Sequence, residues 1–227
     1  MLALLHTSSV HVPVFDALRD RERPGLPLRH VVSEGLLARA RTEGPDAVAG
    51  DIDRILAPAL AAGAAAVLCT CSTIGGVAES RAAALGVPVL RVDRPMAAAA
   101  VAVAPGGGRA ATRIAVIAAL AGTVGPTVAL VDEEAARSGR PVTVTTTVVD
   151  GAWERFESGD RAGYLAAVAA AVEAVDGTAD ADVIVLAQAS MADAAHRVTT
   201  AVPVLSSPAP GLRAAAGAVA RPADETG

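Results

Sequence analysis

The sequence predicts an α/β protein of two pseudo-symmetric, flavodoxin-like halves, each a parallel sheet flanked by helices. Short apolar segments alternate with Ala-rich stretches of helical length, which is typical of parallel sheets covered on both faces. The alternation restarts after a glycine run at 106–108, the best candidate for a linker. The halves also resemble each other: AVLCTCS at 66–72 aligns with IVLAQAS at 184–190, and GVPVL at 86–90 with AVPVL at 201–205.

Each predicted strand is a short apolar run bounded by polar or turn-forming residues. In the first half we expect strands at 2–5, 28–32, 65–68 and 87–92, with helices at 12–19, 34–41, 46–62, 74–85 and 95–104. In the second half we expect strands at 114–118, 142–149, 183–186 and 202–205, with helices at 128–138, 160–175, 192–199 and 211–220. The tail at 222–227 is expected to be disordered.

This pattern divides the chain into a first domain at residues 1–98, which carries Cys71, and a repeat-related second domain at 99–207. Two similar halves imply a pseudo-twofold axis. We therefore expect the active site in the cleft between the halves, where the carboxyl ends of the strands face each other.

Composition excludes several classes of function. Hydrophobic residues make up 52% of the 227 residues, enough for a core, whereas aromatic residues make up only 2%. The net charge of −5 and the lack of a basic cluster argue against a nucleic-acid partner. All 19 basic residues are Arg, so the chain has no lysine for a Schiff base, pyridoxal phosphate or a phosphate-binding loop.

Cellular location follows from what the sequence lacks. No apolar run reaches the roughly 18–20 residues of a membrane span, and the longest, at 55–69, is interrupted by Pro58 and Gly63. The start has no basic segment of the signal-peptide type. Two cysteines two positions apart do not form a disulfide framework, so we expect a reduced, cytoplasmic protein without membrane contact.

Cys71 is the main candidate for a catalytic residue. It follows a buried strand and precedes a helix, which is where ligands bind in open α/β sheets. A helix N-terminus favours the thiolate form, which acts as a base or a nucleophile. Cys69 lies inside the predicted strand and is expected to be a buried structural residue.

Short hydroxyl side chains gather at the predicted strand ends. They include Thr7, Ser8, Ser72, Thr73, Thr123 and Ser190. Hydroxyls beside helix N-termini form anion sites and also cap helices, and one residue can do both. A small carboxylate fits better than a nucleotide, because the glycine run at 106–108 precedes a strand instead of following one.

The four histidines have no metal-ligand spacing, so we expect no metal. His6 and His11 follow the first strand and could line the cleft, which leaves a Cys–His pair as an alternative. His30 lies in the second strand and is expected to be a structural hydrogen-bonding residue.

Several segments resemble the aspartate/glutamate racemase superfamily. Cys71, Ser72 and Thr73 after an apolar strand are similar to its Cys-Asn-Thr motif. The segments LAQASM at 186–191 and VPVLSSP at 202–208 are similar to its Asp/Glu racemase-like members, and LLHT at 4–7 and RVDRPM at 91–96 also fit. The resemblance extends from residue 1 to about residue 215.

The resemblance implies an isomerase without a cofactor, in which a cysteine from each half faces one side of the carbon α to a carboxylate. One thiolate removes the proton and the opposite thiol returns one, while hydroxyls and backbone N–H groups stabilise the enediolate. The resemblance also implies a homodimer, a small carboxylate as substrate, and a final helix at 208–220 that packs back on the first domain.

The second half departs from this pattern. In the repeat alignment Ala189 matches Cys71, and the adjacent Ser190 is no general base without help. We therefore keep four readings open: an amino-acid racemase-like isomerase, a one-cysteine decarboxylase like arylmalonate decarboxylase, cysteine-nucleophile chemistry like that of maleate isomerase, and a non-catalytic carboxylate-binding paralogue.

Overall fold

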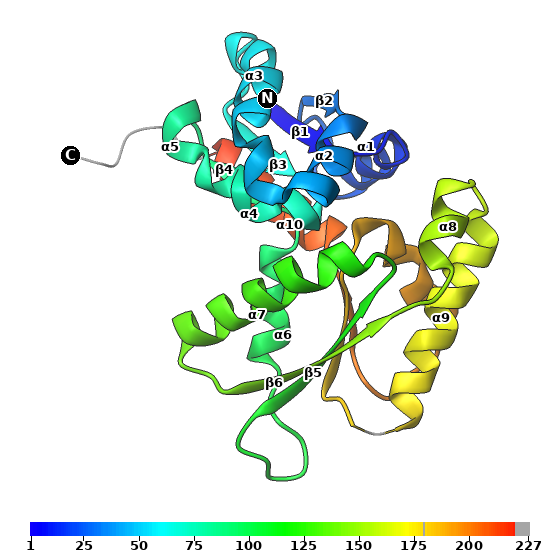
Figure 1. Ribbon diagram of the computed structural model, residues 1–227. Helices are drawn as coiled ribbons and strands as arrows, with labels where there is room; N and C mark the ends of the chain where they lie inside the picture. Colours follow the sequence, from blue (N-terminus) through cyan, green and yellow to red (C-terminus); the bar gives the residue numbers. More distant parts are fainter. Residues whose placement is uncertain (179, 221–227) are drawn as a thin grey trace. The chain divides into compact units, whose positions relative to one another are not determined.

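The computed structural model describes residues 1–178 and 180–220, so the tail at 222–227 lies outside the described residues. The chain forms two compact units, Met1–Val92 with the chain from Pro208 onward, and Asp93–Ser207 (Figure 1). Residues 93–98, expected with the first half, cluster with the second unit, because Met96 and Ala97 belong to its core.

The first unit contains one parallel sheet of four strands in the order β2-β1-β3-β4. Its strands are β1 (Leu2–His6), β2 (Leu28–Val32), β3 (Ala66–Cys69) and β4 (Val89–Arg91). Its helices are α1 (His11–Glu22), α2 (Glu34–Glu43), the 3₁₀ segment η1 (Pro45–Val48), α3 (Ala49–Ala61), α4 (Ser72–Ser80), α5 (Ala82–Leu85) and α10 (Pro208–Ala220).

The second unit repeats this topology with the strand order β6-β5-β7-β8, again all parallel. Its strands are β5 (Thr112–Ala118), β6 (Val142–Val148), β7 (Val183–Leu186) and β8 (Val204–Ser206). Its helical segments are α6 (Arg94–Ala102), η2 (Ala121–Thr123), α7 (Val124–Ser138), α8 (Ala152–Glu157), α9 (Arg161–Gly177) and η3 (Ala189–Arg197). Two parallel sheets flanked by helices confirm the predicted fold class.

The glycine run at 106–108 is not the linker that we expected, because it lies inside the second unit between α6 and β5. The Asp182 carboxylate accepts hydrogen bonds from the N–H groups of Gly106 (3.0 Å) and Arg113 (2.8 Å) and also binds the Arg109 guanidinium. Burial alone would raise the pKa of Asp182, but these donors lower it below its usual value. The carboxylate therefore ties this loop to the sheet.

Several helical predictions differ from the structure. The expected helix at 46–62 is divided into η1 and α3, and the expected helix at 74–85 is divided into α4 and α5. The expected helix at 192–199 is the 3₁₀ segment η3, which starts three residues earlier, and α8 was not predicted. In α8, Trp153 stacks on Phe156 with ring centroids 5.0 Å apart. A helix of six residues is too short to produce a clear hydrophobic period in the sequence.

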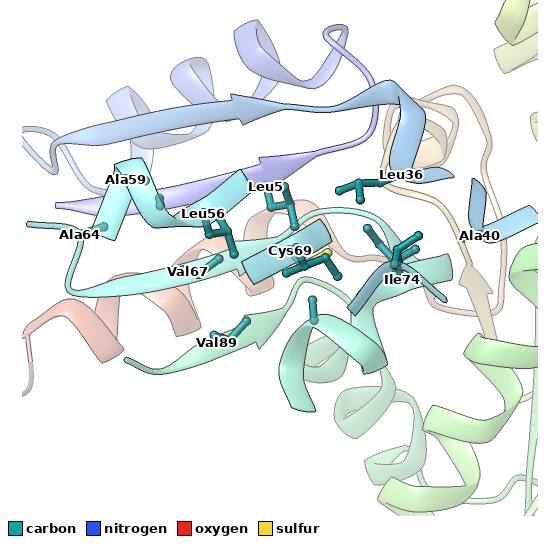
Figure 2. Packing of buried hydrophobic residues seen from close by; sticks show 14 residues of the cluster. Leu5, Leu36, Ala40, Leu56, Ala59, Ala64, Val67, Cys69, Ile74 and Val89 are labelled. Atoms are coloured by element: carbon teal, nitrogen blue, oxygen red, sulfur yellow. The ribbon is translucent and has the colours of Figure 1, made fainter. Parts of the chain in front are cut away.

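Alternate residues of the first sheet face two separate cores, as the two-residue period of a strand requires. One core joins Ala3, Leu5, Val67 and Cys69 to the helices between β2 and β4, and Figure 2 shows the Cys69 sulfur inside it. The other core places Leu2, Leu4 and Leu68 against Phe15 of α1 and Leu212 of α10. Cys69 is fully buried.

The second sheet is covered in the same way. Ile114, Val116 and Val185 face α6 and α7, whereas Ala115, Ile117 and Ile184 face α8, α9 and η3. Both units are thus three-layer α/β structures whose strands are buried on both faces.

Candidate active site

Cys71 occupies the N-cap position of α4, two residues after the end of β3. Its backbone is extended, with φ −107° and ψ 115°, and its side chain makes no capping hydrogen bond. The thiol is half-buried. Ser72 and Thr73, expected as possible caps, are instead the first two residues of α4 and are both buried. Cys71 therefore lies at the N-terminal, positive end of the dipole of a nine-residue helix.

The sheet register brings the loop after β1 beside this turn. Leu5 pairs with Cys69, and the Thr70 N–H donates to the Leu5 carbonyl at 3.0 Å. Thr7 and Ser8 therefore leave the sheet at the same carboxyl edge as Cys71, Thr7 buried and Ser8 half-buried. The first unit thus gathers five of the predicted site residues at one edge: Thr7, Ser8, Cys71, Ser72 and Thr73.

A series of hydrogen bonds between side chains lies next to this edge of the sheet. His6 Nδ1 lies 2.8 Å from Thr70 Oγ1, and His6 Nε2 lies 2.9 Å from His30 Nδ1. His30 Nε2 lies 3.3 Å from the Asp16 carboxylate. His30 thus has the structural hydrogen-bonding role that we predicted for it.

The hydrogen-bond partners of Thr70 and His6 determine which ring nitrogens carry the protons. Thr70 Oγ1 also lies 3.1 Å from the Leu5 carbonyl, which can only accept, so the hydroxyl donates there and accepts from His6 Nδ1–H. His6 Nε2 then carries no proton and accepts from His30 Nδ1–H.

His6 is a poor candidate for a catalytic acid. It is the last residue of β1, not a loop residue, and is fully buried. Burial lowers the pKa of His6 to about 3, with further lowering by His11 and His30, so the ring is neutral at pH 7. His11 is also buried, and its ring stacks on His6 with centroids 6.1 Å apart. His196 is exposed in η3.

The second unit holds the remaining predicted residues. Thr123 is buried at the N-cap of α7. Ser190 Oγ lies 2.7 Å from the hydroxyl of Tyr164, which is buried in a core. Burial raises the pKa of Tyr164 to about 12, although the hydrogen bond with Ser190 lowers it slightly. Ser190 is therefore bonded to a neutral phenol and not to a group that would activate it as a base.

The hydrogen-bond register corrects the match between the two halves. Val67 N–H donates to Pro88 O, and Ile184 N–H donates to Pro203 O, each at 2.9 Å. Val67 is therefore equivalent to Ile184, where the sequence alignment had matched Ala66 with Ile184.

The neighbouring strand gives the same result. Thr70 N–H donates to Leu5 O at 3.0 Å, and Ala187 N–H donates to Ile117 O at 2.9 Å. The residue after Thr70 is Cys71, and the residue after Ala187 is Gln188. Gln188, and not Ala189, is thus the counterpart of Cys71. Similarity of small side chains had shifted the alignment by one residue, whereas backbone hydrogen bonds fix the register.

Gln188 was not among the residues that the sequence predicted for the site. It is the N-cap of η3, as Cys71 is the N-cap of α4, with φ −108° and ψ 144°. Its Oε1 accepts from Ala119 N–H at 3.0 Å, and its Nε2 lies 3.2 Å from Thr123 Oγ1. Because a backbone N–H only donates, the amide orientation is fixed. The signal in the sequence was a lone Gln, the single one in the chain, at the end of a buried strand.

These features define a two-unit α/β protein with a thiol at one strand end and a carboxamide at the equivalent strand end. The family model of Asp/Glu/Hydantoin racemase matches residues 7–215, and the chain belongs to this family. The sequence has no significant match among curated proteins.

Solved structures share the fold over most of both chains. An aspartate racemase homologue from Pyrococcus horikoshii OT3 is 10% identical, with 97% of this chain and 99% of that chain covered and a TM-score of 0.66. Glutamate racemase from Aquifex pyrophilus is 15% identical, with coverages of 93% and 81% and a TM-score of 0.61. Arylmalonate decarboxylase is 18% identical, with coverages of 98% and 93% and a TM-score of 0.57.

Two further findings concern residues 1–178 and 180–220 alone. Within these ranges no helix is long and apolar enough to cross a membrane. The same residues contain no group of three or more His, Cys, Asp or Glu side chains that could hold a metal ion.

Proposed function

We propose that the protein is a cofactor-independent isomerase of the racemase type, acting at the carbon α to a carboxylate of a small amino acid or related acid. Cys71 is its acid and base. The single observation that carries this proposal is the half-buried Cys71 thiol at the N-cap of α4, at the carboxyl edge of the first sheet. Membership of the Asp/Glu/hydantoin racemase family supports the same reaction type.

The proposed reaction begins when the Cys71 thiolate removes the α-proton. The C–H electron pair moves into the carboxylate and gives an enediolate, and Cys71 becomes a neutral thiol. Thr7, Ser8, Ser72 and Thr73, together with the N–H groups of the first turn of α4, stabilise the added charge. The thiol returns a proton to the same face, after exchange of that proton with water, which gives α-proton exchange with retention. Inversion needs a proton delivered to the opposite face, and in this proposal Ser190 or a bound water delivers it more slowly because their pKa values are poorly matched to this task.

The second unit holds the other residues that we include in this proposal. Thr123, Ser190 and the Ala189 segment of η3 are its candidate substrate-binding residues, and the proposed reaction uses neither metal nor cofactor. The protein works as a cytoplasmic homodimer in this proposal. The family resemblance supports the dimer, and the two free cysteines support a reducing compartment.

A second candidate is a cofactor-free decarboxylase. The observation that favours it is Gln188 at the position equivalent to Cys71, because one thiol serves one face only. In this reaction carbon dioxide leaves, the C–C electron pair forms the same enediolate, and the Cys71 thiol protonates it. The fold is shared with arylmalonate decarboxylase.

The first test compares Cys71→Ala with Cys69→Ala, the neighbouring thiol. L- and D-aspartate, L- and D-glutamate and phenylmalonate are incubated with each protein in D₂O, and α-deuteration, inversion and CO₂ release are measured. We expect Cys71→Ala to lose at least about a hundredfold in rate, as for a general acid–base residue. Cys69→Ala keeps the rate and loses about 1 kcal/mol of stability, because Cys69 is a core residue.

The possible outcomes distinguish the isomerase, the decarboxylase and a binding protein without turnover. Deuteration or inversion of an amino acid supports the isomerase, whereas CO₂ release from phenylmalonate supports the decarboxylase. Equal losses in both variants, at equal folded fraction, would show that the wrong thiol was chosen. A Cys71 that iodoacetamide does not alkylate at any pH from 6 to 9, with no reaction on the whole panel, would favour a binding protein without turnover.

A further inference from the structure

We propose that β6 is a docking surface for a second copy of this chain, and that the two β6 strands pair antiparallel around a twofold axis at Thr145. This pairing joins two four-stranded sheets into one continuous sheet. The inference deepens the proposed function at one point, because it rests on the homodimer and names its interface. It is independent of the chemistry at Cys71.

β6 differs from the other edge strands of the two sheets. It has seven residues, VTVTTTV, with no charged residue, glycine or proline among them. The edge strands β4 and β8 have three residues each, and β2 has five, including Arg29 and His30. Short length and charge protect a sheet edge from pairing with another chain, and β6 has neither protection. Val148 of β6, at 41%, is among the most exposed large hydrophobic residues of the described chain.

Half of the backbone groups of β6 are directed away from its own sheet. Pro141 O accepts from Thr112 N–H at 3.1 Å, and Val149 N–H donates to Ala118 O at 2.8 Å, so the odd-numbered residues from 141 to 149 face β5. Successive residues of a strand direct their N–H and C=O groups to opposite edges. The even-numbered residues therefore direct theirs outward, and these are Val142, Val144, Thr146 and Val148.

The sequence of β6 is nearly the same when it is read in either direction from Thr145. In an antiparallel pair centred there, every outward-facing residue meets an outward-facing residue of the second copy, which gives about eight backbone hydrogen bonds. A shift of one residue would oppose outward-facing residues to inward-facing ones, and a larger shift would leave the ends unpaired. The opposed side chains are Val142 with Val148, Thr143 with Thr147, Val144 with Thr146, and Thr145 with its own copy.

The residues that flank β6 have complementary charges in the same register. Arg140 and Asp150 lie equally far from Thr145, so Arg140 of one copy is opposite Asp150 of the other at both ends of the pair. Both side chains are exposed, and the Arg140 guanidinium donates to a neutral group, Ala102 O, at 3.0 Å. This charge complementarity, together with the near-symmetric sequence, favours a second copy of the chain over an unrelated peptide as the partner.

The strength of the dimer follows from the size of the interface. One pair of strands covers less than the roughly 800 Å² per partner of a standard stable interface, so we expect a dissociable dimer with a Kd in about the micromolar range. Sedimentation velocity of the wild-type protein between about 1 and 100 μM should therefore show a monomer–dimer equilibrium.

The first experiment removes one outward-facing donor. Thr146→Pro deletes an N–H that faces away from β5, and an edge strand tolerates proline at such a position. We expect the Kd of the dimer to rise at least about tenfold. Thr146→Val is the matched control, because it keeps the N–H and should dimerise as the wild-type protein does. Circular dichroism and urea unfolding show whether both variants are folded.

The second experiment exchanges the flanking charges. Arg140→Asp and Asp150→Arg each oppose like charges at both ends of the pair, so each variant alone should dimerise about tenfold more weakly than the wild-type protein. An equimolar mixture of the two variants opposes unlike charges at both ends and should recover the wild-type Kd as a heterodimer. Within one chain the two positions lie at opposite ends of β6, so this recovery requires pairing between copies.

The results distinguish this inference from the rest of the proposed function. A wild-type protein that stays monomeric overturns both the β6 interface and the homodimer, whereas α-deuteration in D₂O tests the Cys71 reaction separately. A dimer that withstands Thr146→Pro and both charge reversals has its interface elsewhere, which overturns the β6 pairing and keeps the homodimer. If Thr146→Pro does not fold, the charge exchange decides, and a mixture that dimerises no better than its components overturns the pairing around Thr145.

Discussion

At the scale of single residues, the histidine chain shows how a buried polar group is tolerated. His6 is fully buried, yet both ring nitrogens have partners, Thr70 and His30. A buried polar group without a partner costs about 1–3 kcal/mol of stability, whereas a typical hydrogen bond contributes about 0.5–1.5 kcal/mol net. Thr70 immediately precedes Cys71, so the hydrogen bonds of Thr70 also anchor the turn that carries the thiol.

The low pKa of His6 predicts acid sensitivity. The folded state holds the ring neutral, with the pKa lowered to about 3 chiefly by burial, whereas the unfolded chain takes up a proton near pH 6.5. Between these values the unfolded state binds more protons, so stability rises with pH and is lost as pH falls below about 6.5. The slope is at most about 1.4 kcal/mol per pH unit.

The variant His6→Asn removes this titration and keeps a side-chain donor near Thr70. Urea unfolding at pH 7.0, 6.0 and 5.0 should show a steeper loss of stability in the wild-type protein than in His6→Asn. His30, His11 and Asp16 face the ring and remain in both proteins. The exposed His196→Gln serves as the control with wild-type behaviour. Parallel pH curves for wild type and His6→Asn would contradict the assignment of a neutral His6.

At the scale of elements, the packing of α10 on the first unit depends on a close contact between Gly211 and Val92. A Cβ built on Gly211 would lie 2.5 Å from Val92 O and 2.6 Å from Val92 Cγ2. The helix therefore packs on the end of β4 at a distance that only glycine allows. Gly217 lies in the same helix, is exposed, and has nothing within 4 Å of a built Cβ.

Substitution of these two glycines by alanine should change the stability of the protein in opposite directions. We expect Gly211→Ala to lower stability by about 1–3 kcal/mol, because the new methyl meets the Val92 backbone. Gly217→Ala should raise stability by up to about 1 kcal/mol through helix propensity. Urea unfolding of the two variants checks both signs. A stabilising Gly211→Ala would show that α10 does not sit this closely on Val92.

At the scale of the whole molecule, the second unit is continuous in sequence and the first is not. Residues 93–207 contain a complete sheet with cores on both faces. The first unit needs α10, whose Leu212 and Ala215 complete the core beneath Leu2, Leu4 and Leu68. The chain therefore leaves the first unit once and returns to it at the end.

This organisation predicts the behaviour of fragments. A fragment of residues 93–207 should fold alone, whereas residues 1–92 should fold only when residues 208–220 are joined to them. Dispersion of amide signals in NMR spectra distinguishes folded from unfolded fragments. A folded 1–92 fragment, with stability equal to that of the extended one, would show that α10 contributes little to the first core.

The sequence by itself determined the fold class, most elements and the position of Cys71 between a buried strand and a helix. Apolar runs of strand length with helical stretches between them leave few alternatives to a covered parallel sheet. The segments at 28–32 and 183–186 were predicted residue for residue. This position of Cys71 could be predicted because the order of a buried strand, a short turn and a helix is a local feature of the sequence.

Only the tertiary structure decided which residues of the two halves are equivalent and which side chains meet. The repeat register depends on hydrogen bonds between strands, such as those of Val67 to Pro88 and Ile184 to Pro203, and these join residues far apart in the chain. For this reason Gln188 replaced Ala189 as the counterpart of Cys71. The same holds for the contact between His6 and His30, since strand pairing brings side chains together that no local pattern relates.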